Sequence, residues 1–194
     1  MRPKNLEKEA SIREKALSII SEEGLENLSM QKLAKAAGVS PRTIYIKYKD
    51  KEDLLIKLFI DEVLGSYEKA VLDGFSESMS LDIGIKCLWS NAWHYFMEHR
   101  EAFALMQYGR SSPLLNQAFR ERNIEEGMFF GSVHSWVGSL AQKGVIPDMP
   151  MAAFRALTFA PLLDLIQEHF EHPAVITEDL FWNCCQTLIK GIQL

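Results

Sequence analysis

The chain has 194 residues, of which 47% are hydrophobic and 24% charged, and its formal net charge is −5. This composition is that of an ordinary globular protein and excludes fibrous, disulfide-built and disordered chains. The charge is unevenly divided, because residues 1–55 carry a net charge of +2 and residues 56–194 carry −7. We therefore expect a small basic contact surface on an acidic body.

Four helices are predicted in the N-terminal part. Apolar residues at helical spacing predict a helix over residues 5–23, which Gly24 ends. Ser29 caps a short second helix that stops at Gly38, and Ser40 followed by Pro41 opens a short third one. A much longer helix begins at Lys51.

The rest of the chain also has helical spacing, after a break at residues 74–80. Helices are predicted over residues 81–98, 101–109, 113–142, 151–169 and 177–192, with Pro161 kinking the fourth of these. The sequence therefore predicts an all-α fold with two domains, residues 1–55 and residues 56–194.

The second and third predicted helices have the pattern of a helix-turn-helix. Gly38 permits the positive φ of the tight turn. If Ile44 and Tyr48 face inward, the helical period turns an outward set of four residues of the third helix toward solvent and places a fifth residue at the edge of that face. The outward set is Arg42, Thr43, Ile46 and Lys47, with Tyr45 at the edge. These side chains suit phosphates and base edges of DNA, although a solvated bundle corner has the same periodicity.

Residues 28–55 resemble the DNA-binding domain of the TetR family of bacterial transcriptional repressors. The resemblance is carried by S-M-Q-K-L-A-K-A-A-G-V-S-P-R-T-I-Y-I-K-Y-K-D-K-E-D-L-L. It implies a homodimer whose two third helices enter the major grooves of a palindromic double-stranded DNA operator. It also implies base or backbone contacts from Pro41, Arg42, Thr43, Tyr45, Ile46 and Lys47, and phosphate contacts from Ser29 and Lys51. Lys47 and Arg42 depart from the residues that are frequent there, so the operator sequence stays open.

Aromatic and apolar stripes in the acidic part are typical of a protein core. The family resemblance implies more, namely a pocket for a small-molecule effector in this stretch. The expected pocket walls are Trp89, Trp93, Phe96, Met106, Tyr108, Phe119, Phe130 and Val133, and the candidate polar contacts are Asn91, Gln107 and His134. Because no cluster of Lys or Arg lies in these helices, we expect an apolar or weakly polar effector.

The last two predicted helices carry stripes that suit either a dimer interface or the core of one protomer. The first stripe is Ala153, Ala156 and Ala160, and the second is Phe181, Cys185, Leu188 and Ile192. The sequence alone leaves both possibilities open. The resemblance implies dimerisation through these two helices.

Other functions have weaker support in the sequence. His169 and His172, with Glu168 and Glu171, could hold a metal, but exposed histidines are common at a helix end. The adjacent Cys184 and Cys185 favour buried thiols over a disulfide or a redox pair. Without a nucleophile or phosphate-loop motif, we expect no enzyme activity, no cofactor and no metal.

The charged N-terminus, and the lack of an apolar run near the length of about 18 residues that spans a bilayer, indicate a cytoplasmic protein without a membrane partner. The sequence therefore predicts a dimeric DNA-binding regulator, most simply a repressor released by its effector. A carrier of hydrophobic ligands that does not use its helix-turn-helix is the alternative.

Overall fold

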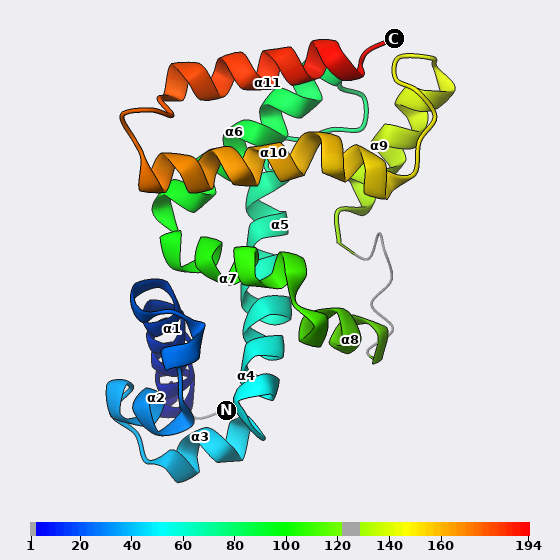
Figure 1. Ribbon diagram of the computed structural model, residues 1–194. Coiled ribbons are helices and arrows are strands. Elements are labelled where there is room, and N and C mark those ends of the chain that lie inside the picture. Colours follow the sequence, from blue (N-terminus) through cyan, green and yellow to red (C-terminus); the bar gives the residue numbers. More distant parts are fainter. Residues whose placement is uncertain (1–2, 122–128) are drawn as a thin grey trace. The chain divides into compact units, whose positions relative to one another are not determined.

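The computed structural model describes residues 3–121 and 129–194, without the side chains of residues 3–7, 61, 62, 111 and 119. Every regular element in these ranges is a helix, which confirms the predicted all-α class (Figure 1). The elements are α1 (Pro3–Glu23), the 3-10 helix η1 (Leu25–Asn27), α2 (Met30–Ala36), α3 (Pro41–Lys47), α4 (Lys51–Lys57), the π-helix η2 (Leu58–Leu64), α5 (Gly65–Val71), α6 (Leu81–Glu98), α7 (Arg100–Ser111), α8 (Pro113–Glu121), α9 (Gly131–Gln142), α10 (Met151–Glu171) and α11 (Glu178–Ile192).

The chain forms two compact units. Unit 1 comprises residues 1–66 and 98–125, and unit 2 comprises residues 67–97 and 126–194. The boundary interrupts the helical run that begins with α4, since η2 belongs to unit 1 and most of α5 to unit 2. The division predicted at residue 55 stays a prediction.

Unit 1 is built on the inner faces of its N-terminal helices. Ile12 and Ala16 of α1, Leu33 of α2 and Ile44 of α3 are all fully or almost fully buried. Helix α7 packs along α1 and against η2. Where α7 meets η2, position 109 requires glycine, because a Cβ atom there would lie 2.1 Å from the ring of Phe59. Unit 1 thus supports its N-terminal helices with a helix from much later in the sequence.

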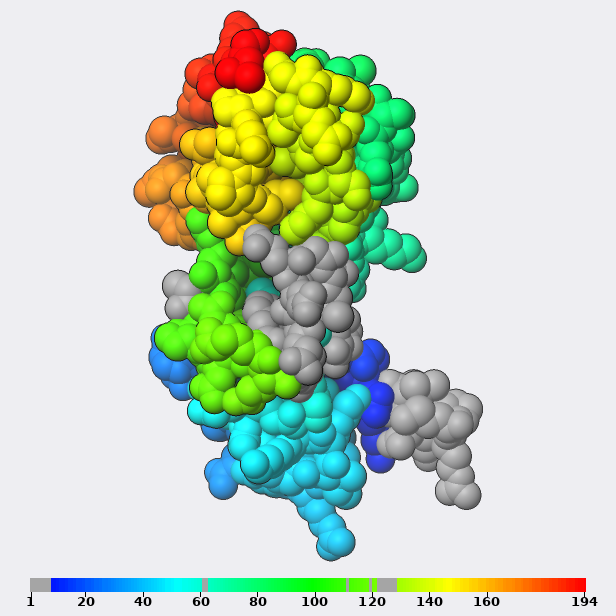
Figure 2. Space-filling model, turned by 90° about the vertical axis from the view of Figure 1, so that its right-hand side faces the viewer, coloured from blue at the N-terminus to red at the C-terminus, as the bar shows by residue number. Residues whose placement is uncertain are grey.

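Unit 2 has an aromatic core. The indole of Trp136 is fully buried, makes edge contacts with the rings of Phe75 and Phe154, and donates a 2.9 Å hydrogen bond to the carbonyl oxygen of Met79. The backbone N–H of Leu194 donates to the carbonyl oxygen of Val145 at 3.0 Å, so the red C-terminus lies beside the yellow segment after α9 in Figure 2. These contacts bring α9, α10, the segment before α6 and the C-terminus together around one core.

The single helix predicted over residues 113–142 is wrong. Helix α8 ends at Glu121 and α9 begins at Gly131. Before α9, Phe130 has a left-handed backbone with φ 59°, its N–H donates to the carboxylate of Glu68, and its ring contacts that of Tyr67. These tertiary contacts oppose a continuous helix, although the apolar periodicity runs through the break.

Helix α10 contains Pro161 and continues past it to Glu171, two residues beyond the predicted end at residue 169. Within the residues described, no helix is both long and apolar enough to span a membrane.

Candidate nucleic-acid interface

Helices α2 and α3 form the predicted helix-turn-helix. Gly38 has the positive φ of 63° that the turn requires, and the N–H of Val39 donates to the carbonyl oxygen of Ala34 at 3.0 Å. Ser29 caps α2 through a 3.2 Å bond from the N–H of Lys32, and Ser40 caps α3 in the same way from the N–H of Thr43. The local signals in the sequence therefore set both helix starts.

Helix α3 has one buried and one exposed face. Ile44 is fully buried and Tyr48 is 2% exposed, whereas Tyr45 is 52% and Ile46 is 78% exposed. Pro41, Arg42 and Ser29 are exposed, and Thr43, Lys47 and Lys51 are half-buried. A short helix that leaves a large aliphatic side chain almost fully in water presents a surface suited to a partner.

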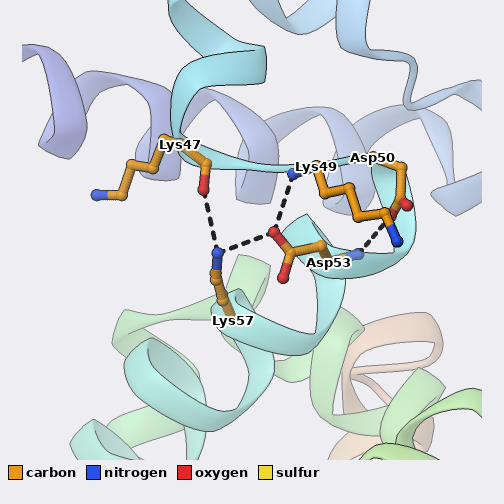
Figure 3. A network of polar contacts seen from close by, with 5 residues as sticks. All are labelled: Lys47, Lys49, Asp50, Asp53 and Lys57. Carbon is orange, nitrogen blue, oxygen red and sulfur yellow. Dashed lines mark hydrogen bonds and ion pairs between the residues drawn. The ribbon is translucent and has the colours of Figure 1, made fainter.

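The C-terminal end of α3 is held by a network of polar contacts (Figure 3). The Nζ atom of Lys57 donates to the carbonyl oxygen of Lys47 at 3.0 Å and to Oδ2 of Asp53 at 2.8 Å. Asp53 also accepts a 3.0 Å bond from the N–H of Lys49, and its own N–H donates to Oδ1 of Asp50 at 2.8 Å. The two ends of α4 thus contribute together, because Asp53 positions Lys57 and Lys57 holds the C-terminal end of α3.

Two lysines that the family resemblance assigns to DNA already have partners within unit 1. The ammonium of Lys47 forms a 2.8 Å ion pair with Oε2 of Glu9 on α1. The ammonium of Lys51 donates to the carbonyl oxygen of Leu25 in η1 at 2.7 Å. An ammonium has three donors, so both lysines keep capacity for a phosphate.

Glu9, Asp53 and Lys57 were not among the residues that the sequence predicted for this site. The i, i+4 spacing of Asp53 and Lys57 is a signal that could have found their pair. No sequence pattern links Glu9 to Lys47, because they lie on different helices and meet only in the folded unit 1.

The residues predicted to line the effector pocket are divided between the two units. Met106 and Tyr108 lie on α7 in unit 1, and the side chain of Phe119 is outside the described residues. The other five, all in unit 2, are Trp89, Trp93, Phe96, Phe130 and Val133.

The unit 2 wall residues divide between two aromatic clusters and a buried aliphatic position. The rings of Trp89 and Trp93 lie 5.1 and 4.3 Å from that of Phe181, measured between ring centroids. Tyr67 joins the other cluster, since its ring centroid lies 4.9 Å from that of Phe96 and 5.7 Å from that of Phe130. Val133 is buried on α9.

The polar groups near these clusters differ in their bonding. Asn91 donates to the carbonyl oxygens of Val71 and Asp73, at 2.9 and 2.7 Å, so its amide has a structural role. The indole Nε1 of Trp89 is buried and has no hydrogen-bond partner among the residues that the structure describes. A buried donor of this kind is costly unless a ligand or water supplies an acceptor.

Phe181, Cys185 and Ile192 are buried within the protomer and Leu188 is half-buried, so most of this stripe of α11 belongs to the core of unit 2. Burial raises the pKa of the Cys185 thiol to about 12, which keeps it protonated and unreactive near neutral pH.

His169, a candidate metal ligand in the sequence, has its Nδ1 2.6 Å from the carbonyl oxygen of Ile176. Within residues 3–121 and 129–194, no three potential ligands from His, Cys, Asp and Glu side chains are grouped to hold a metal.

A groove with a volume of about 670 Å³ lies between α1 and the start of α7 in unit 1. Its lining is mixed in charge and includes none of the residues predicted to line the effector pocket. The groove is lined by Ala10, Arg13, Glu14, Leu17, Ser18, Ser21, Glu22, Arg100 and Glu101.

Comparison with known proteins agrees with this geometry. Residues 12–58 match the family model described as bacterial regulatory proteins, tetR family. An HTH-type transcriptional regulator of Haemophilus influenzae is 30% identical over 95 residues, which are 49% of this chain and 50% of that protein. The match thus spans about half of that curated relative.

Two solved structures are similar over almost the whole chain. A TetR family transcription regulator from Marinobacter aquaeolei VT8 is 25% identical and has a TM-score of 0.84. The match covers 100% of this chain and 99% of that one. The transcriptional regulator FadR from Bacillus subtilis, in complex with stearoyl-CoA, is 18% identical with a TM-score of 0.73, over 95% of this chain and 99% of that one. Residues 12–58 therefore form a helix-turn-helix domain that matches the TetR family of bacterial regulatory proteins, and the whole chain has the all-helical fold of a TetR family transcription regulator.

Proposed function

We propose that the protein is a dimeric transcriptional regulator that binds a palindromic DNA operator through α3. The single observation that carries this proposal is the outer face of α3, where Tyr45 and Ile46 are exposed while Ile44 and Tyr48 anchor the helix from behind. Major grooves admit a helix of this kind, and the two-fold symmetry of a dimer matches a palindrome.

The side chains of this face divide by what they can contact. Arg42 and Lys47 suit guanine edges or phosphates, and Ile46 suits a thymine methyl group. The hydroxyl groups of Tyr45 and Ser29, and the ammonium of Lys51, suit phosphates. Pro41 and Thr43 complete the proposed interface at the N-terminal end of α3.

Dimerisation is proposed through α10 and α11. Because Phe181, Cys185 and Ile192 are buried within unit 2, the interface must use other faces of these helices. Ala156 is exposed and Ala153 and Ala160 are half-buried on α10, and Leu157 is 48% exposed beside them. This apolar strip supports helix packing across a two-fold axis. Leu157→Glu is expected to shift the protein to monomers in analytical ultracentrifugation, whereas Arg155→Glu, at an exposed neighbouring position, serves as the control.

The effector is proposed to be an apolar or weakly polar small molecule held in unit 2, with the N–H of Trp89 as a donor. The buried, unpartnered indole nitrogen supports a ligand that carries an acceptor atom. FadR of Bacillus subtilis, which has a similar fold, is a relative in complex with stearoyl-CoA, whose acyl chain is apolar. Effector binding would change the separation of the two α3 helices through the helical run from Lys51 to Val71, and so release the operator.

The test is a fluorescence-anisotropy titration of the full chain against DNA obtained by selection from random sequence, with scrambled DNA as control. Selective binding that weakens with salt is expected. Tyr45→Phe and Lys47→Ala should each lower operator affinity while the dimer persists in ultracentrifugation. Unchanged affinity in both variants contradicts the contact assignment, and failure to select any DNA favours the ligand-carrier function.

A further inference from the structure

A carboxylate from α1 meets the proposed DNA-binding helix at Lys47. Oε2 of Glu9 lies 2.8 Å from Nζ of Lys47, and the same oxygen lies 4.0 Å from Nη1 of Arg13. The side chains of Lys47 and Glu9 are 30% and 21% exposed, so the pair is at the surface of unit 1 without being fully solvated. An anion is thus held beside a helix whose proposed partner is a polyanion.

The backbone and the side chain of Lys47 serve different contacts. Its carbonyl oxygen accepts from Lys57, whereas its side chain extends away from Lys57 (Figure 3). The network with Lys57 and Asp53 therefore does not use the Lys47 ammonium, which pairs with Glu9 and lies 5.7 Å from the centre of the Tyr48 ring. Nothing in the local packing of α3 requires that ion pair, because the buried Ile44 and Tyr48 already fix the helix.

We propose that Glu9 is an affinity-lowering residue, whose carboxylate competes with a DNA phosphate for the Lys47 ammonium. This inference rests on the proposed function. A phosphate bonded to the same ammonium would lie within about 6 Å of the Glu9 carboxylate, where two like charges repel appreciably even in a partly solvated site. Lys47 is also partly neutralised before DNA arrives, so it displaces fewer counterions from the DNA.

The effect should not depend on DNA sequence, because phosphate contacts carry no sequence information. Removing the Glu9 charge should tighten binding to operator and to unrelated DNA by a similar factor. Glu9 would thereby lower the sequence-independent part of the affinity and leave the base contacts of Arg42 and Ile46 unchanged.

The experiment compares Glu9→Gln with Glu14→Gln in the full chain, by anisotropy titration on selected operator DNA at several salt concentrations. Glu14 is a matched control, because it lies on the same helix, its side chain is 72% exposed, and it pairs with Lys15 rather than with α3. Both variants change the net charge equally. Circular dichroism melting checks that each is folded.

Glu9→Gln is expected to bind about three- to tenfold more tightly than the wild type at low salt. The slope of log affinity against log salt should steepen by up to about 0.9 per protomer. Glu14→Gln should show neither change. If Glu9→Gln binds no more tightly than Glu14→Gln, or keeps the wild-type slope, the proposal is overturned.

A double variant tests whether the effect passes through Lys47. In a Lys47→Ala background, Glu9→Gln should no longer raise affinity or steepen the slope. An undiminished gain in that background overturns the competition for Lys47. Absence of salt-dependent binding by the wild-type protein would instead contradict the proposed function itself, so the two failures are distinguishable.

Discussion

The Nζ atom of Lys57 lies 3.0 Å from the backbone carbonyl oxygen of Lys47, the last residue of α3. The same ammonium pairs with Asp53 and lies 5.5 Å from the centre of the Tyr48 ring. A side chain of α4 thus supplies the C-terminal bond of α3, at a place where no glycine cap follows the helix. This bond adds to the burial of Ile44 and Tyr48 in holding α3 in place.

Replacing Lys57 with Met keeps the aliphatic length and removes the ammonium. We expect the free energy of unfolding to fall by about 1–2 kcal/mol, because a charge-assisted bond and a half-buried ion pair are lost together. Operator affinity should fall as well, since the end of α3 is released. Urea unfolding and anisotropy titration measure the two effects. Lys69→Met, at an exposed position in unit 2, is the control, and an equal loss there would refute the role of Lys57.

The cap of α3 gives a second prediction. Ser40→Ala removes the acceptor for the N–H of Thr43 and should lower the free energy of unfolding by about 1 kcal/mol. Ser40→Gly should cost only a few tenths of a kcal/mol, since glycine leaves that N–H open to water. Both variants are compared with the wild type by urea unfolding; a Ser40→Ala protein as stable as the wild type would show that the serine oxygen contributes nothing.

Gly84 of α6 is expected to tolerate no side chain. A Cβ atom there would lie 2.3 Å from Cζ2 of Trp136, whose indole is held by its bond to Met79. Gly84→Ala should therefore destabilise the protein by about 1–3 kcal/mol. Gly138→Ala is the matched control in α9, because it meets no atom within 4 Å and should instead stabilise its helix by about 0.5–1 kcal/mol. Thermal melting gives the sign of each change.

Stability should decline at alkaline pH. Burial raises the pKa of Cys185 to about 12, and burial together with the nearby Tyr95 raises the pKa of Tyr67 above its ordinary value of 10.0. Both groups ionise more easily in the unfolded chain, so the unfolded state binds fewer protons there. The free energy of unfolding should therefore be unaffected below pH about 8, where both groups are protonated in either state, and should fall as the pH rises from there toward 12.

Urea unfolding at pH 8, 9.5 and 10.5 measures this decline. Tyr67→Phe should make it shallower, because one of the two groups is removed. Tyr45→Phe, which changes a tyrosine that is 52% exposed, should follow the wild type. A decline that is identical in all three proteins would count against the buried phenol.

The sequence by itself determined the helix-turn-helix and the two faces of α3. Ser29, Gly38 and Ser40 act on the backbone within three residues of themselves, and the burial of Ile44 and Tyr48 follows from the 3.6-residue period. Such signals are local and can be read without a fold. The same holds for α6, which has the predicted bounds, and for the passage of α10 through Pro161.

Only the tertiary structure decided which groups meet across the sequence. It began α9 only at Gly131, because Glu68 and Tyr67 hold Phe130 in a left-handed conformation before that helix. It assigned the Phe181 stripe to the core of unit 2, and it brought Glu9 to Lys47. Periodicity reports that a face is apolar or charged, but the partner of that face lies on another helix, and packing alone brings the two together.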